Sequence, residues 1–319
     1  MKKKIIKLTY FHKNANLDKY FSDEFFNDFE FHVNDPSCVV CDYWIVYGGL
    51  LCKNEVAFVD PKNIFLFVGE HDGQYSYKFL EQFSKVFTID PHYTNDNLVY
   101  HHTSVPWFID EKFDELYHQQ KVHKDRVISI VASDKAYTTY TRNYRHRYEF
   151  VKTIMKYFGN NIDVFGRGFK EIENKSEALL RYKYSIAIEN VPLPFNITEK
   201  IADCFLMHTF PFYYACPNID RFYPRDAYEN IDIMDIDFSI KVIESILNTA
   251  EHYEKHVAAI IEAKKIYLMN YSFQSAIVNG IKRYGTPAGK KQIVKINDNN
   301  RIRSNLKIKI IDLTFNLLK

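Results

Sequence analysis

The sequence predicts an α/β protein built from two parallel-sheet domains, and three observations support this. Short runs of β-branched and aromatic residues recur along all 319 residues. Amphipathic stretches long enough to form helices separate most of these runs, which is typical of parallel strands joined by crossover helices. The chain is also too long for one ordinary core and long enough for two. We therefore expect two Rossmann-like domains.

The first half of the chain alternates in this way. Its expected strands are 5–11, 39–47, 64–68 and 86–89, and its expected helices are 17–29, 75–83 and 111–120. The polar, charged stretch 119–126 has the composition of a linker. The first domain is therefore expected to cover residues 1–120.

The second half continues the pattern. Its expected strands are 127–132, 162–165, 184–188 and 209–214, and its expected helices are 145–158, 176–182, 197–207, 238–248 and 250–284. Gly285, Thr286 and Pro287 end the pattern, so the second domain is expected to cover 121–287. Residues 288–319 remain as a tail that mixes basic with apolar residues.

Composition and motifs exclude several classes of protein. A net charge of +2 does not indicate a nucleic-acid-binding protein. The chain contains no GxGxxG and no P-loop, which argues against NAD enzymes and P-loop NTPases. No apolar run approaches the ~20 residues that span a bilayer. The five cysteines include a CxxC at Cys38 and Cys41, but no second pair completes a zinc site. We expect buried free thiols in a cytoplasmic protein.

The most informative stretch is an apolar strand that ends on Glu189 and Asn190, followed by a loop and a helix expected to start near residue 197. A helix start presents unpaired N–H groups and the positive end of the helix dipole. With Lys200 in the first turn, the stretch predicts a phosphate or diphosphate site. The same residues fit a capping box with Asn196 as N-cap and Glu199 as third helical residue. Glu199 has a second interpretation, as an acceptor for sugar or ribose hydroxyls.

This pattern resembles the α-1,3/4-fucosyltransferases, glycosyltransferase family 10. The segments that carry the resemblance are 163–166, 182–190, 197–200 and 210–214, with weaker similarity at 67–70 and at 131–133 followed by Arg147. The resemblance implies a GT-B fold with two facing domains, the first for the acceptor and the second for the donor. It also implies inverting transfer of L-fucose from GDP-fucose to a glycan hydroxyl, without a metal or cofactor in the site.

The resemblance also suggests roles for individual residues. Glu70, at the end of an expected strand, would act as the general base, with His71 and Asp72 as alternatives. Arg147, or Arg145 in its place, would stabilise the leaving diphosphate together with Lys200. The donor-binding set is Arg147, Glu189, Asn190, Asn196, Thr198, Glu199 and Lys200.

The sequence departs from the family pattern at four places. They are Asn196 for an aromatic residue, Asp134 for Asn, residues 71–73 after the expected base, and Ala215 or Cys216 where a glycine ends a strand. The first change leaves a related glycosyltransferase with another nucleotide sugar as an alternative hypothesis. A non-catalytic sugar-nucleotide-binding or scaffold protein is a further alternative.

Two further segments have competing interpretations. Residues 290–319 either attach peripherally to an anionic membrane or pack on the body of the protein as an extra element. The membrane interpretation places the enzyme on the inner face of the membrane, where it would modify a surface glycan such as lipopolysaccharide. The DxD formed by Asp235 and Asp237 resembles a metal motif, but it lies between an expected strand and an expected helix, so we favour a helix cap at Asp237.

Overall fold

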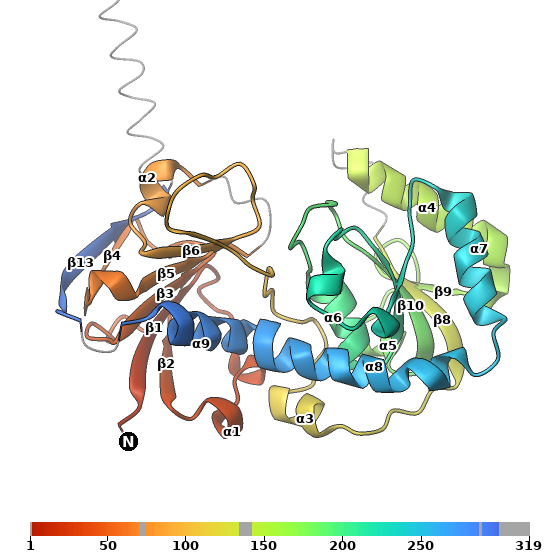
Figure 1. The fold of residues 1–319 in the computed structure, drawn as a ribbon, viewed down its shortest axis with the longest axis horizontal. Coiled ribbons are helices and arrows are strands. Elements are labelled where there is room, and N and C mark those ends of the chain that lie inside the picture. The colour runs from red at the N-terminus through yellow and green to blue at the C-terminus, as the bar shows by residue number, and fades with distance from the viewer. Residues whose placement is uncertain (1, 70–74, 134–141, 287–288, 300–319) are drawn as a thin grey trace, which may run out of the picture. The chain divides into compact units, whose positions relative to one another are not determined.

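The computed structural model describes residues 2–69, 75–133, 142–286 and 289–299 (Figure 1). The chain divides into two compact units. Unit 1 contains the described residues of 1–17, 22–103 and 274–319, and unit 2 contains residues 18–21 and 104–273. Each unit has a parallel β-sheet as its main sheet, so the predicted α/β class is confirmed. No helix in the described parts of the chain is both long and apolar enough to cross a membrane.

Unit 1 is built on a six-stranded parallel sheet with the order β2-β1-β3-β5-β6-β7. Its strands are β1 (Lys4–Tyr10), β2 (Phe29–Val33), β3 (Tyr43–Tyr47), β5 (Ile64–Phe67), β6 (Lys85–Thr88) and β7 (Leu98–Tyr100). Its helices are α1 (Asp23–Phe26), α2 (Tyr77–Leu80) and α9 (Phe273–Tyr284), the last from its second residue on. Every residue of β3 and β5 is buried, which explains why both segments are apolar runs without alternation.

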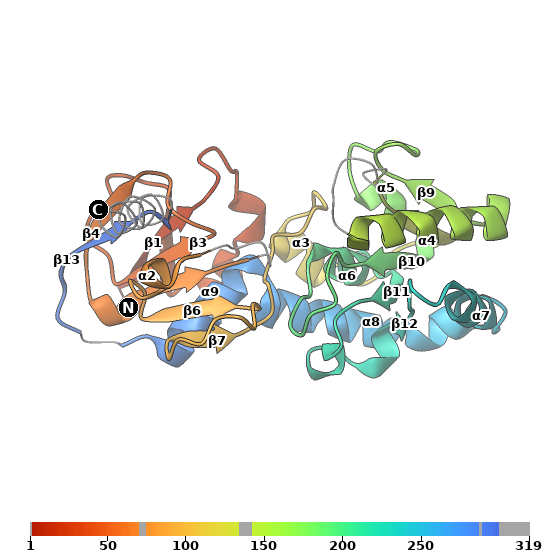
Figure 2. The ribbon, with the colours of Figure 1, turned by 90° about the horizontal axis from the view of Figure 1, so that it is seen from above.

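A two-stranded antiparallel ribbon completes unit 1 (Figure 2). It pairs β4 (Asn54–Val59) with β13 (Gln292–Asn297), and the side chain of Ile296 is fully buried in the core. Part of the expected tail is therefore a packed strand. Residues 300–319, on which the membrane interpretation also depends, lie outside the described residues.

Unit 2 is built on a five-stranded parallel sheet with the order β12-β11-β10-β8-β9. Its strands are β8 (Arg126–Val131), β9 (Asp163–Phe165), β10 (Tyr182–Ile188), β11 (Phe210–Tyr214) and β12 (Glu229–Asn230). Its helices are α3 (Phe113–His118), α4 (Arg142–Phe158), α5 (Ser176–Leu179), α6 (Glu199–Leu206), α7 (Ile236–Leu247) and α8 (His252–Ile266). Figure 1 shows α5 and α6 on one side of the strands and α4 and α7 on the other.

Short helical turns connect these elements. The 3₁₀ turns are Asp18–Tyr20, Pro61–Asn63, Gly159–Asn161, Ile219–Arg221 and Arg225–Ala227, and a π-helical turn covers Tyr267–Tyr271.

The helix predictions are longest relative to the observed helices in two places. The expected helix 17–29 is a 3₁₀ turn and the four-residue helix α1, after which β2 begins at Phe29. The expected helix 250–284 is interrupted by the π-helical turn and by Ser272, which has extended backbone. The Ser272 hydroxyl donates to the carbonyl of Leu268 at 2.8 Å. Such a local bond competes with regular helix, and an amphipathic pattern alone does not reveal it.

The division into units differs from the expected boundary at residue 120, because residues 104–120 pack in unit 2. Trp107 and Phe113 are fully buried there, and the carbonyl of Trp107 accepts the Tyr20 hydroxyl at 2.9 Å. Residues 274–286, expected in the second domain, belong to unit 1. There a Cβ at Gly280 would lie 2.9 Å from the ring of Phe87, so this helix packs tightly in unit 1.

Candidate functional site

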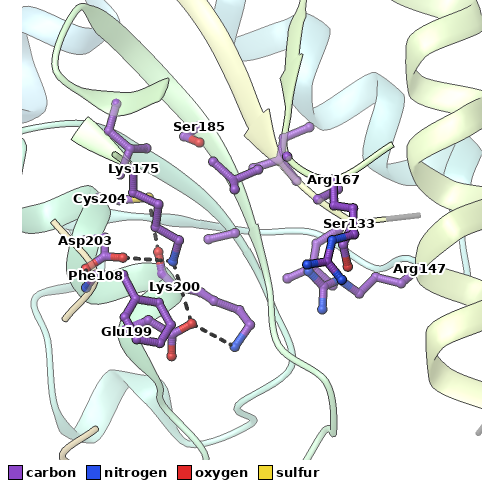
Figure 3. Close-up of a pocket in the computed structure, with 17 residues that line it drawn as sticks. Phe108, Ser133, Arg147, Arg167, Lys175, Ser185, Glu199, Lys200, Asp203 and Cys204 are labelled. Carbon is purple, nitrogen blue, oxygen red and sulfur yellow. Dashed lines mark hydrogen bonds and ion pairs between the residues drawn. The ribbon is translucent and has the colours of Figure 1, made fainter. Parts of the chain in front are cut away.

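A cavity of about 560 Å³ opens at the carboxyl ends of β8 and β10 in unit 2 (Figure 3). Its walls come from the ends of these strands, the loop after β9, the first turns of α6 and part of α4. Ligands of parallel α/β sheets bind at this edge. The labelled lining residues are Phe108, Ser133, Arg147, Arg167, Lys175, Ser185, Glu199, Lys200, Asp203 and Cys204.

A buried ion pair joins the end of β10 to the start of α6. The Glu189 side chain is 1% exposed, and its carboxylate accepts the backbone N–H of Thr198 at 2.8 Å and the Thr198 hydroxyl at 2.7 Å. Lys200 Nζ lies 3.2 Å from Glu189 Oε2 and donates to Thr198 Oγ1 at 2.8 Å. These bonds fix the direction in which Lys200 leaves the helix, because both of its partners are themselves held.

A second charged group extends from Glu199. Its Oε1 lies 3.4 Å from Lys200 Nζ and 3.6 Å from Lys175 Nζ, and Lys175 also contacts Asp203 Oδ2 at 2.8 Å. Burial alone would raise the pKa of Glu199, but the ammonium groups of Lys200 and Lys175 outweigh burial and lower the pKa to about 2. Burial would lower the pKa of Lys200, yet Glu189 and Glu199 raise it above its usual value. These groups are therefore ionised at neutral pH.

One oxygen of this group has an unused acceptor position. Glu199 Oε2 is buried and has no hydrogen-bond partner among the described residues. A buried ionised carboxylate oxygen without a donor is costly. Because Glu199 lines the cavity, a bound ligand can supply the missing O–H or N–H donor.

Arg147 lies on the cavity wall and donates from Nη1 to Asn190 Oδ1 at 2.6 Å. Asn190 is the second residue after the end of β10, so this bond ties the helix α4 to the strand end. Arg145, the alternative to Arg147, is exposed and does not line the cavity.

The expected capping box is wrong. The N-cap of α6 is Thr198 and Glu199 is the first helical residue, so the helix begins two residues later than a cap at Asn196 requires. The Asn196 side chain donates to the carbonyl of Val191 at 2.6 Å and closes the loop before the helix. The Thr198 hydroxyl is occupied by Glu189 and makes no cap bond. The Thr198 hydroxyl thus bonds to Glu189, at the other end of the loop, in place of a backbone N–H in the first turn of α6.

The expected donor-binding residues have different positions in the structure. Arg147, Glu199 and Lys200 line the cavity. Glu189, Asn190, Asn196 and Thr198 do not line it. Glu189 and Thr198 contact Lys200, and Asn190 contacts Arg147. Asn196 closes the loop before α6 through its bond to Val191.

Some expected residues lie outside the described part of the chain. They are Glu70, with its alternatives His71 and Asp72, and Asp134. The expected cap at Asp237 is wrong: Asp235 caps α7 by accepting the N–H of Phe238 at 3.0 Å, and Asp237 is the second helical residue. Within the described ranges, no group of three or more His, Cys, Asp or Glu is arranged to hold a metal ion.

Sequence reasoning missed Lys175, Asp203, Arg167 and Phe108. Asp203 could have been predicted from the sequence, since it lies four residues after Glu199 on the same face of one helix. The other three lie in connecting segments with no periodic pattern, and only the fold brings them to the cavity.

Comparison with known proteins supports the resemblance. Residues 122–271 match the family described as "Glycosyltransferase family 10 (fucosyltransferase) C-term". This part of unit 2 is therefore similar to glycosyltransferase family 10. An alpha-(1,3)-fucosyltransferase, FucT, of Helicobacter pylori is 25% identical over 111 residues, which are 33% of this chain. The matched region spans 23% of the length of that relative.

Two solved structures share the fold of this chain. An alpha1,3-fucosyltransferase with GDP-fucose has a TM-score of 0.54 and 16% identity, covering 91% of this chain and 93% of that one. An alpha1,3-fucosyltransferase with GDP has a TM-score of 0.52 and 17% identity, covering 89% and 92%. At this identity the likeness concerns the fold, which is of the GT-B type.

Proposed function

We propose that this chain is an inverting glycosyltransferase that transfers L-fucose from GDP-fucose to a hydroxyl of a glycan. The observation that carries the proposal is the cavity of unit 2, where Arg147, Lys200 and a buried carboxylate oxygen without a hydrogen-bond partner among the described residues meet at the sheet edge. The similarity of residues 122–271 to the fucosyltransferase family supports sugar transfer. The similar fold of an alpha1,3-fucosyltransferase solved with GDP-fucose supports the donor.

In this proposal the donor occupies the cavity. Arg147 and Lys200 face the diphosphate and stabilise the charge that develops on it as the sugar leaves. Glu199 Oε2 accepts a hydrogen bond from a hydroxyl of the ribose or of the sugar, which satisfies its unused acceptor position. The proposed reaction needs no metal and no cofactor, since the side chains provide the charge compensation.

The chemical step needs one base. The acceptor oxygen attacks the anomeric carbon, the bond from that carbon to the phosphate oxygen breaks, and GDP departs with the bonding electrons. The acceptor proton passes to a carboxylate on the face opposite GDP. We assign this role to Glu70, which follows the buried strand β5 by three residues.

The acceptor and the location in the cell are part of the same proposal. We propose a surface glycan such as a lipopolysaccharide side chain as acceptor, and a cytoplasmic enzyme associated peripherally with anionic membrane through the tail 290–319, in which residues 292–297 form β13. Liposome sedimentation tests the second point: a chain that ends at Asn299 should lose binding to anionic vesicles. Equal binding of both chains would remove the membrane role.

A binding and hydrolysis screen tests the donor. Calorimetric titration with GDP, UDP and CDP should give measurable binding of GDP alone, and GDP-fucose should be the nucleotide sugar that the enzyme hydrolyses slowly without acceptor. Binding of UDP without GDP would refute the guanine assignment in favour of another nucleotide sugar.

A single substitution separates an enzyme from a binding protein. Glu70→Gln should lower turnover by about 100-fold or more while GDP affinity stays within twofold. Turnover equal to that of the unmodified chain would rule out Glu70 as the base.

A further inference from the structure

We propose that Arg167 is a further diphosphate-binding residue, one that adds positive charge beyond that of Lys200, whose ammonium group is already paired with Glu189 and Glu199. The inference rests on the proposed function, and it assigns the phosphate contact to a side chain that the sequence pattern did not indicate. Its starting point is the charge balance of the site.

The lysine side of the cavity has no surplus positive charge. Lys200 and Lys175 provide two ammonium groups, and the carboxylates in contact with them are Glu189, Glu199 and Asp203. A diphosphate that approached this group would meet cations already paired with buried anions. Charges that are paired at about 3 Å attract a third charge only weakly.

The ionisation of Asp203 does not change this conclusion. Burial and the neighbouring Glu199 raise the pKa of Asp203, and Lys175 opposes them. Both carboxylate oxygens accept hydrogen bonds, Oδ1 from the backbone N–H of Phe108 at 3.1 Å and Oδ2 from Lys175 at 2.8 Å. If Asp203 is ionised, the group contains three carboxylates and two ammonium groups. If Asp203 is protonated, it contains two of each. In neither case does this side of the cavity carry net positive charge.

Arg167 is held against the end of β8 by a tight loop. It lies between Gly166, with φ of 113°, and Gly168, with φ of 82°. A Cβ at Gly166 would lie 2.0 Å from the carbonyl oxygen of Ala132, so only glycine permits this approach. The Gly166 N–H donates to the carbonyl of Lys170 at 2.8 Å and closes the loop.

This loop places Arg167 on the wall of the cavity opposite the carboxylates. Figure 3 shows Arg167 beside Ser133 and Arg147, and Glu199, Asp203, Lys175 and Phe108 on the other side. The cavity therefore has a guanidinium side and a carboxylate side. A nucleotide sugar has the matching division into an anionic diphosphate and hydroxyl-bearing sugars.

The guanidinium of Arg167 is available for a ligand. The side chain is exposed, and within the described ranges it has no ion pair with a carboxylate and no hydrogen-bond partner. Arginine also presents a planar fork of donors that fits two phosphate oxygens at once. Arg167 is thus a lining cation whose charge is not offset by a carboxylate contact.

The test compares a nucleotide that has the diphosphate with a nucleoside that lacks it. Calorimetric titrations with GDP and with guanosine would be run on the full chain and on Arg167→Gln, Arg167→Lys and Lys170→Gln. Lys170 is a matched control because it is a cation of the same loop that lies outside the lining and sits over the ring of Phe165. Circular dichroism and thermal midpoints would verify that each variant folds.

We expect Arg167→Gln to weaken GDP binding by about tenfold or more and to leave guanosine binding unchanged. Arg167→Lys should recover part of the GDP affinity, and Lys170→Gln should match the unmodified chain. Unchanged GDP affinity in Arg167→Gln would overturn this inference alone, and so would an equal loss for guanosine. An unmodified chain that binds no nucleoside diphosphate would overturn the proposed function as well.

Discussion

His208 should make unit 2 less stable at mildly acidic pH. Its side chain is buried, and its Nε2 lies 3.0 Å from Lys264 Nζ. Burial lowers the pKa of Lys264 to about 7, so this side chain is an ammonium group on the acidic side of that value. An ammonium group can only donate, so there Nε2 accepts and the ring is neutral. Burial, followed by the charges of Lys264 and Lys124, lowers the pKa of His208 from 6.5 to about 3.

The size of the effect follows from the difference between the folded and unfolded states. A pKa that is lowered by folding contributes stability above the unfolded value of 6.5, and that stability is lost as pH falls toward the folded value. One pKa unit corresponds to about 1.4 kcal/mol. Between pH 7.5 and 5, which is about 1.5 units below the unfolded pKa, the His208 contribution should fall by about 2 kcal/mol. The result does not depend on the folded pKa as long as that value is below 5.

The assay is urea unfolding at the two pH values, followed by fluorescence. The chain has two tryptophans: Trp44 belongs to unit 1 and Trp107 to unit 2. In a Trp44→Phe background, Trp107 therefore reports on unit 2, which avoids averaging two separate transitions.

The comparison variant is His208→Gln, whose side-chain oxygen can accept from Lys264 but does not titrate. The positive φ of 54° at this position makes glutamine costly at both pH values, so this cost cancels in the difference. The unmodified unit should lose about 2 kcal/mol more than the variant on acidification. Equal losses would refute the assignment of a neutral, buried His208.

Three further predictions concern the site. Lys200→Met should cost about 3–5 kcal/mol in thermal unfolding, because it leaves Glu189 buried without its cation; a loss below 1 kcal/mol would contradict the buried pair. Thr198→Val should cost about 1–3 kcal/mol and Thr198→Ser much less, since the hydroxyl is the part of the Thr198 side chain that bonds to Glu189 and the backbone N–H bond remains in both variants; equal costs would point to packing instead. Gly166→Ala should weaken GDP binding in calorimetry, because the new Cβ would meet the Ala132 carbonyl; unaltered binding would show that the loop can shift.

The sequence determined the elements that are set by local pattern. Buried parallel strands are continuous apolar runs, so β5 and β10 could be located from composition alone, and with them the polar residues at the end of β10. The sequence also indicated Arg147, Glu199 and Lys200, all of which line the cavity. Glu199 and Lys200 lie in the first turn of α6, which local pattern locates, whereas Arg147 was indicated by the family resemblance.

Tertiary structure decided the ribbon pairing, the cap of α6 and the remaining cavity residues, because these features depend on contacts between separate segments of the chain. β4 and β13 pair across more than 200 residues, and neither has a local pattern that specifies a partner. Thr198, and not Asn196, is the N-cap, and the Thr198 hydroxyl bonds to Glu189 across the loop. Lys175 and Arg167 reach one cavity from separate loops. Periodicity indicates which face of an element is buried, but which charges meet is fixed only when the elements pack.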